Sequence, residues 1–233
     1  MSQDLTRREW IRCVSTGGLL IAGSLAPLSS LLPAEQGARG SSRGPQPPEP
    51  SPVRTPATYV DGKVVQPRRE LPVLRKTSVL VVGGGPAGTA AALSAQRAGV
   101  DVTLVERYGY LGGLATGGLV LAIFPLYARN NRQVILGIGE EMMKRLESLK
   151  YGIIERNKAP IYPTIDAEAF KYVLADMVLQ SGLNAYLDCW GVDAIIDDHG
   201  AVRGAVFESK SGRQVILADV VVDATGDGDI FAA

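Results

Sequence analysis

The sequence predicts an α/β fold, in which a parallel sheet with helices is followed by a small antiparallel β meander. Three patterns predict this fold. A continuous apolar strand at residues 78–82 leads through a glycine-rich turn into a helix and a second apolar strand. An amphipathic helix lies between Asp166 and Gly182, and several short β-rich pieces follow from Asn184 onward. Strands that alternate with helices indicate a parallel sheet, and short strands separated by turns indicate a meander.

The composition supports a packed core and excludes some classes of partner. Hydrophobic residues make up 46% of the chain and charged residues 21%, as in globular domains. Lys and Arg number 24, and Asp and Glu also number 24. Since nucleic-acid binding needs a basic excess, we expect no nucleic-acid partner.

Few residues are suited to metal binding or nucleophilic catalysis. The single histidine, His199, follows two aspartates and precedes a glycine, which predicts a solvated turn. One of the two cysteines, Cys13, lies in the N-terminal segment, and the other, Cys189, stands beside Trp190. A free cysteine is usually a buried core residue. The sequence therefore predicts no metal site and no disulfide.

Residues 1–36 are predicted to be an export signal. Arg7 and Arg8 stand before an apolar stretch at residues 14–28 that is rich in Gly and Ser. A charged start followed by a modest apolar run is the layout of a secretory signal, and the run is too short and glycine-rich for a stable transmembrane segment. The paired arginines resemble a twin-arginine signal. We therefore expect the twin-arginine export machinery as a partner and a periplasmic or envelope location.

Residues 37–70 are predicted to be a tether between the signal and the domain at 71–233. Six prolines fall between residues 45 and 56, and a segment so rich in Pro, Gly and Ser buries too little apolar surface to fold alone. Asp61-Gly62 predicts the turn of a short hairpin at residues 59–64.

The turn after the first strand has the spacing of a dinucleotide-binding fingerprint. Gly83, Gly85 and Gly88 fit G-x-G-x-x-G, with Pro86 and Ala87 between them. In such a turn the first glycine permits the tight bend, the second lets the backbone approach a pyrophosphate, and the third lets the helix pack closely on the strand. The free N–H groups at the start of the helix then face the phosphates. The pattern predicts a Rossmann-like nucleotide site.

An acidic residue completes this fingerprint. The helix ends at Gly99, and the second strand, residues 102–105, is followed by Glu106. A carboxylate at this place accepts hydrogen bonds from the ribose of an adenosine and repels a 2′-phosphate. The site is therefore predicted to hold an ADP-containing cofactor other than NADP.

The next segment favours FAD over NAD. Residues 107–118 are rich in glycine, where a nicotinamide dehydrogenase would usually continue with a helix and strand. Three motifs, at residues 79–88, 106–116 and 223–229, together resemble the FAD-dependent oxidoreductases of the glutathione-reductase-like flavoprotein fold. The resemblance covers residues 69–229 and implies FAD as cofactor.

The resemblance also implies roles for individual residues. It implies that the residues from Gly83 to Gly88 hold the pyrophosphate and that Glu106 holds the ribose. Four residues would line the path toward the flavin ring: Arg107, Gly112, Gly113 and Thr116. The backbone near Val192 would touch adenine, and the strand end at Ala224, Thr225 and Gly226 would close over the adenosine side.

The remaining elements follow from periodicity. The apolar residues of 138–149 share one helical face, and Asp166 is predicted to cap a second helix that ends at Gly182. Pieces at 185–187, 192–196, 202–208 and 214–217 are predicted to form the meander, with residues 220–223 as the next parallel strand. Asp223, Asp227 and Asp229 lack the spacing of a calcium loop.

The function predicted from these features is that of an exported FAD-dependent oxidoreductase. The flavin would take a hydride from a small-molecule substrate and pass electrons to an unidentified acceptor, and no catalytic residue is identified. The resemblance places the substrate domain after residue 233, so the chain is expected to be truncated before it. Two alternatives stay open: a truncated, non-catalytic fragment that binds nucleotide weakly or not at all, and an NAD-dependent dehydrogenase.

Overall fold

The computed structural model describes residues 56–123, 126–128, 130, 132–155 and 163–233, with the backbone alone at 153–155. The chain divides into the units Met1–Glu49 and Pro50–Ala233, and every described residue belongs to the second. The predicted signal at residues 1–36 and most of the predicted tether lie outside the described residues. None of the helices in the described ranges is both long and apolar enough to cross a membrane.

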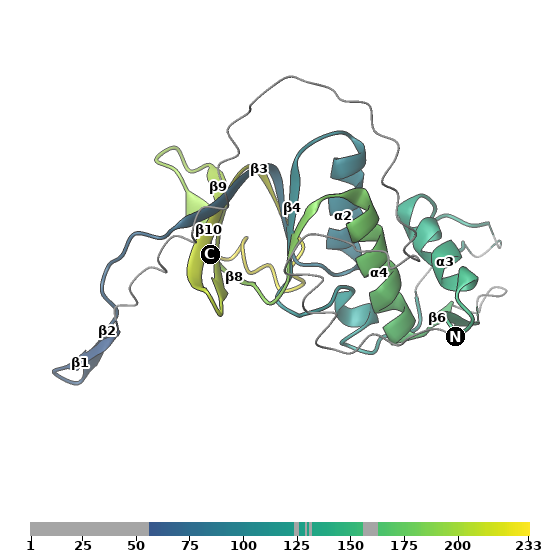
Figure 1. The fold of residues 1–233 in the computed structure, drawn as a ribbon, viewed down its shortest axis with the longest axis horizontal. Helices are drawn as coiled ribbons and strands as arrows, with labels where there is room; N and C mark the ends of the chain where they lie inside the picture. The colour runs from purple at the N-terminus through teal and green to yellow at the C-terminus, as the bar shows by residue number, and fades with distance from the viewer. Residues whose placement is uncertain (1–55, 124–125, 129, 131, 156–162) are drawn as a thin grey trace, which may run out of the picture. The chain divides into compact units, whose positions relative to one another are not determined.

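A six-stranded sheet in the order β7-β4-β3-β10-β9-β8 forms the centre of the fold (Figure 1). Four of its strands are mutually parallel: β3 (Val73–Val82), β4 (Val102–Val105), β7 (Asn184–Tyr186) and β10 (Gly212–Asp223). The antiparallel strands are β8 (Trp190–Ile196) and β9 (Val202–Ser209). Because β4 and β10 lie on opposite sides of β3, the strand order reverses at β3, and ligands bind at such a point beside the carboxyl ends of the strands.

Two details differ from the predicted meander. Strand β7 was expected to belong to it, but it pairs in parallel with β4 at the far edge of the sheet. A helix precedes β7 and returns the chain to the same direction, as a crossover between parallel strands does. The pieces predicted at 214–217 and 220–223 are also one strand, β10, because Asp219 points to solvent and does not interrupt the pairing. Strand β10 therefore joins the meander to the parallel strands.

The helices form where their periodicity and caps predict them. They are α2 (Pro86–Arg97), α3 (Ile138–Ser148) and α4 (Ala167–Ser181). The Asp166 carboxylate accepts a hydrogen bond from the Ala169 N–H at 2.7 Å at the start of α4, and Gly182 ends that helix with φ +73°. Both features confirm the predicted cap and stop.

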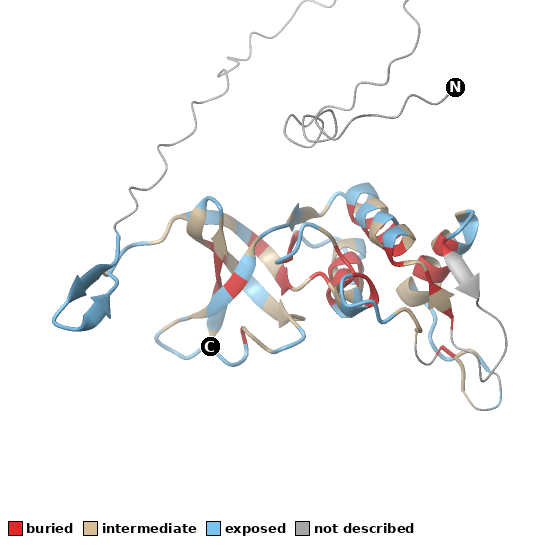
Figure 2. Cartoon of the chain, turned by 90° about the horizontal axis from the view of Figure 1, so that it is seen from below, coloured by how far each residue is buried: buried red, intermediate tan, exposed pale blue. Residues whose placement is uncertain are grey.

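The two faces of the sheet are covered by different elements. On one face, Val81 and Leu104 pack against α2 and α4, including Leu93 and Phe170. The other face of the parallel strands packs against the meander, where Leu80 and Val82 contact a cluster that includes Phe207. Figure 2 shows the buried residues concentrated on the inner sides of the helices and in the sheet. The ends of β3 and β4 are therefore held from both sides.

Two short strand pairs lie outside the sheet. Strands β1 (Thr58–Val60) and β2 (Lys63–Val65) form the hairpin predicted within the tether region, with every residue exposed. Asp61 and Gly62 turn it with φ +51° and +76°, as a two-residue hairpin turn requires. Strands β5 (Ile153–Glu155) and β6 (Thr164–Ile165) form the second antiparallel pair.

Candidate functional site: a nucleotide cavity at the carboxyl ends of the parallel strands

The glycine turn between β3 and α2 is packed as the fingerprint predicts. Gly83 has φ +101°, and a Cβ there would overlap the Ala224 carbonyl. A Cβ at Gly88 would overlap the Gly83 carbonyl oxygen, so the close approach of helix and turn depends on glycine. At Gly85, by contrast, an added Cβ would have no described heavy atom within 4 Å. Its Cα therefore faces open space.

The N-terminus of α2 has features that favour the binding of an anion. Gly85 is the N-cap residue and provides no side-chain cap, Pro86 occupies the first turn, and no acidic residue lies in that turn. The first N–H groups of a helix have no partner within the helix, and with the helix dipole they favour a phosphate. Gly85, Pro86 and Ala87 all line the same cavity.

Glu106 connects the turn to the loop after β4. Glu106 is 5% exposed, and its carboxylate accepts hydrogen bonds from the Gly84 N–H at 2.6 Å and the Tyr108 N–H at 2.8 Å. The side chain also lines the cavity. Since each carboxylate oxygen has two lone pairs, acceptor sites are left for ribose hydroxyls. Glu106 thus also has a structural role that sequence reasoning did not predict.

Residues 111–118 form a braced turn beside the glycine turn. The Gly112 N–H donates to the Gly84 carbonyl at 2.8 Å, and the short 3-10 helix η1 (Gly113–Ala115) follows. The Thr116 hydroxyl is fully buried and donates to the Leu111 carbonyl at 2.9 Å. Gly113 lines the cavity, whereas Gly112 and Thr116 do not. Gly112 and Thr116 therefore stabilise the loop without lining the cavity.

The loop after β10 is organised by one aspartate. Asp223 accepts hydrogen bonds from the Thr225 N–H and hydroxyl at 3.0 and 2.8 Å. It also accepts from the N–H groups of Ile230 and Phe231 at 3.1 and 2.9 Å. Burial by itself would raise the pKa of Asp223, but these hydrogen bonds outweigh it and lower the pKa below its ordinary value of 3.8. The ionised carboxylate holds this loop against the cavity.

The cavity itself has a volume of about 510 Å³, within the range of about 300–1,000 Å³ that is usual for small-molecule sites. Ten of the predicted site residues line it: Gly83, Gly85, Pro86, Ala87, Glu106, Arg107, Gly113, Ala224, Thr225 and Gly226. Four predicted residues do not line it: Gly88, Gly112, Thr116 and Val192. Gly88 has the packing role predicted for it, and Val192 lies next to the lining residue Gly191.

Several lining residues were not predicted. From the loop after β4 they include Tyr108, Tyr110 and Leu114, and from the β7–β8 connection Cys189, Trp190 and Gly191. In the first group, Tyr108 and Tyr110 could have been found, because they are aromatic residues that alternate with glycine at 108–110. The second group lies next to Val192, where the resemblance implied a backbone contact, but its side chains could not have been predicted, because they reach the cavity through the parallel pairing of β7 with β4.

Cys189 was predicted to be a core residue and is half-buried, packed against the cluster around Phe207. Burial and then the neighbouring Asp188 carboxylate raise the pKa of its thiol. A raised pKa disfavours the reactive thiolate. Among the described residues, no group of three or more His, Cys, Asp and Glu side chains could hold a metal ion.

The cavity fits the ADP half of a dinucleotide. The open backbone at Gly85, the start of α2 and the Glu106 carboxylate surround one space, and these groups suit a pyrophosphate and a ribose. Fold and site thus define an α/β nucleotide-binding protein.

Residues 78–233 match the family described as FAD dependent oxidoreductase. The chain belongs to this family, and its cofactor is FAD. Membership decides against the NAD-dependent alternative.

Two relatives and one solved structure illustrate the likeness. The chain is 32% identical over 161 residues to the 6-methylpretetramide 4-monooxygenase of Streptomyces rimosus, covering 64% of this chain and 38% of that protein. It is 33% identical over 163 residues to the thiamine thiazole synthase of Aeropyrum pernix, covering 65% and 55%. The crystal structure of Thermovibrio ammonificans THI4 aligns with a TM-score of 0.49 at 24% identity, covering 67% of this chain and 60% of that one. The chain thus spans about half or less of the length of these two relatives.

Proposed function

We propose that this chain is the cofactor-binding part of an exported oxidoreductase of the glutathione-reductase-like type. In this proposal FAD takes a hydride from a small-molecule substrate and passes electrons to a separate acceptor. The observation that supports it best is the convergence of the Gly85 backbone, the start of α2 and the Glu106 carboxylate on one cavity in a member of this family.

The protein's own contribution is to bind and orient. The N–H groups at the start of α2 would hold the pyrophosphate, and Glu106 would accept hydrogen bonds from the ribose. The loops at 111–118 and 224–229 form further parts of the cavity wall. The flavin, when bound, supplies the redox chemistry, and no residue of the described ranges is assigned as a proton donor or acceptor in it.

The redox role can be tested with the purified chain loaded with FAD under anaerobic conditions. Dithionite should reduce the bound flavin, and a mild oxidant such as ferricenium should restore the oxidised spectrum without releasing the cofactor. A flavin that stays bound but is not reduced, while free FAD in the same buffer is, would contradict an oxidoreductase role.

Export by the twin-arginine pathway is part of the same proposal. Arg7 and Arg8 precede the apolar stretch at residues 14–28, and this pathway suits a protein that binds its cofactor before it crosses the membrane. Replacing both arginines, Arg7→Lys with Arg8→Lys, should abolish export, measured by cell fractionation. The chain offers a matched control in the second arginine pair, Arg68→Lys with Arg69→Lys, which should leave export unchanged. Undiminished export of the first double variant would contradict the proposed pathway.

A further inference from the structure

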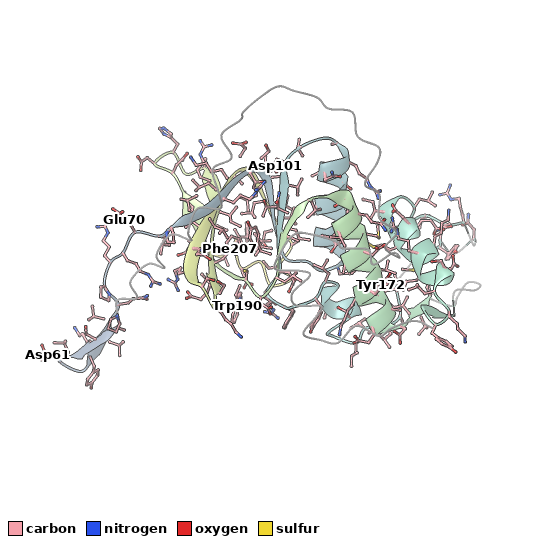
Figure 3. All side chains as sticks on the ribbon, in the orientation of Figure 1. Asp61, Glu70, Asp101, Tyr172, Trp190 and Phe207 are labelled. Carbon is pink, nitrogen blue, oxygen red and sulfur yellow. The ribbon has the colours of Figure 1, made fainter. Side chains whose placement is uncertain are left out.

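The β1–β2 hairpin carries exposed apolar side chains on both of its faces. Directly paired residues of a hairpin share a face, so Tyr59 and Val64 lie on one face, and Val60 and Val65 lie on the other. These four residues are between 49% and 76% exposed. Figure 3 labels Asp61 at the tip of the hairpin. Because an isolated two-stranded hairpin is only marginally stable in water, a partner that covers these side chains would stabilise it.

Unpaired positive charge lies on and directly after the hairpin. Lys63, Arg68 and Arg69 are exposed, and none of them forms an ion pair with a carboxylate of the described residues. Arg75, by contrast, is paired with Asp101 at 2.8 Å. The three cations are therefore available to an anionic partner.

The sequence around the hairpin is basic, although the chain as a whole is neutral. Residues 37–70 contain six Lys and Arg and three Asp and Glu, whereas residues 71–233 contain 15 Lys and Arg and 18 Asp and Glu. The first region is thus net positive and the second net negative. An anionic surface attracts the first region and not the second, so the charge of the chain directs the hairpin toward such a surface.

The distribution of apolar side chains favours a lipid surface over a protein surface. A flat protein surface would cover one face of the hairpin and leave the other face in water. Among lipid headgroups both faces are surrounded, and the backbone groups at the strand edges can still bind water, which the hydrocarbon core would exclude. Tyrosine is also enriched at this depth of a membrane, because its ring is apolar and its hydroxyl is polar.

We propose that the β1–β2 hairpin, together with Arg68 and Arg69, binds a membrane surface that contains anionic lipid. Tyr59 and the valines enter the headgroup layer, and the cations pair with lipid phosphates. Stable attachment of a protein to a membrane surface generally takes two signals, and this segment has both an apolar and a basic one. The binding is separate from the FAD cavity and does not depend on the cofactor.

Co-sedimentation of the full-length chain with vesicles tests this inference. Vesicles of phosphatidylcholine mixed with phosphatidylglycerol should bind the chain more tightly than vesicles of phosphatidylcholine alone. Arg68→Gln with Arg69→Gln should weaken binding to the mixed vesicles about thirtyfold, from the usual contribution of a basic residue near an anionic surface. The control Lys76→Gln with Lys150→Gln removes the same charge from exposed positions outside the segment. It should leave binding nearly unchanged, and an equal loss in both double variants would contradict the site.

The apolar part of the site has its own variants. Tyr59→Ser with Val64→Ser removes the apolar side chains of one face and should weaken binding about tenfold or more. Tyr59→Trp should keep full binding, since tryptophan also favours the membrane interface. The control Tyr172→Ser with Leu179→Ser removes two exposed apolar side chains of α4, where Figure 3 labels Tyr172, and should change nothing.

One substitution should strengthen binding, which a loss of hairpin structure could not do. Asp61→Asn removes a negative charge at the tip and keeps a favoured turn, because Asn-Gly suits a two-residue hairpin turn as Asp-Gly does. Its affinity for the mixed vesicles should rise about fivefold, with no change for phosphatidylcholine alone. An unaltered affinity for the mixed vesicles would contradict the role of charge at the hairpin.

Two further outcomes would overturn the membrane site. Vesicle binding that survives the Arg68, Arg69 and Tyr59, Val64 double variants unchanged would place the attachment in another segment, such as the apolar stretch at residues 14–28. A chain that binds neither kind of vesicle would leave a protein as the partner of the hairpin. Both outcomes would leave the assignment of the FAD cavity intact.

Discussion

The glycine turn and the wall formed by Arg107, Tyr108 and Trp190 line the same cavity, but they are built differently. In the turn, backbone atoms lie so close together that Gly83 and Gly88 have no room for a side chain. In the wall, the shape comes from the side chains of Arg107, Tyr108 and Trp190. The first region needs the absence of side chains, and the second needs particular ones.

This difference has a consequence for mutation. A substitution in the turn should lower the stability of the fold where its new atoms meet protein atoms. It should weaken ligand binding where its new atoms meet open space. Changes in the wall act mainly on the ligand, because Trp190 is 55% exposed and Tyr108 is 40% exposed. The following variants test this separation, from the largest expected effect to the smallest.

Gly88→Ala should have the largest effect and should act on folding. Its Cβ would overlap the Gly83 carbonyl oxygen, which is a backbone atom and cannot move aside alone. We expect the free energy of unfolding to fall by about 3 kcal/mol, at the upper end of overpacking costs, measured by urea denaturation of the full-length chain. An unfolding midpoint equal to that of the unsubstituted chain would show that helix and turn are not this close.

Gly85→Ala is the matched substitution in the same turn and should act on binding alone. Gly85 has φ −64° and ψ −179°, a conformation open to alanine, and its Cβ would meet no described atom within 4 Å. The unfolding midpoint should be unchanged, while the new methyl group should weaken FAD about tenfold or more, or about 1.4 kcal/mol. Unaltered FAD affinity in a titration would mean that the phosphates do not approach this residue.

Glu106→Ala should affect both properties, because Glu106 joins the two regions. The change removes the acceptor of the Gly84 and Tyr108 N–H groups and the predicted ribose contact. We expect the binding free energy of FAD and the free energy of unfolding each to weaken by about 1–3 kcal/mol, the cost of losing hydrogen bonds to a charged group. Flavin content after gel filtration and urea denaturation measure the two effects. Unchanged flavin content would contradict the assignment to ribose.

Asp223→Asn should have the smallest effect, and the effect should depend on pH. The hydrogen bonds to Asp223 lower its pKa in the folded chain, so the carboxylate contributes stability above its ordinary pKa of 3.8. That contribution is lost as the pH falls through the lowered pKa. Urea midpoints of both chains should differ most near neutral pH and converge below that value. A difference in urea midpoint that grows as the pH falls would mean that the pKa of Asp223 is not lowered in the folded chain.

The turn was predictable from sequence, whereas Arg107 and the backbone near Val192 were the only predicted parts of the wall, and the difference has a physical reason. The roles of Gly83, Gly85 and Gly88 depend on local spacing alone, as do the Asp166 cap and the Gly182 stop of α4. Trp190 meets Arg107 only because β7 pairs in parallel with β4, and three residues of strand carry little information about their partner. The second role of Glu106 was missed because its donors are backbone N–H groups, which leave no trace in the sequence.

The measurement that tests the central claim most directly is the absorbance spectrum of the purified 233-residue chain, with any released cofactor identified by mass. We expect an oxidised flavin spectrum and FAD as the released molecule, with Gly85→Ala equally folded but depleted of FAD. A folded chain that stays colourless when FAD is added, or that releases NAD in its place, would contradict the claim that this cavity is an FAD site.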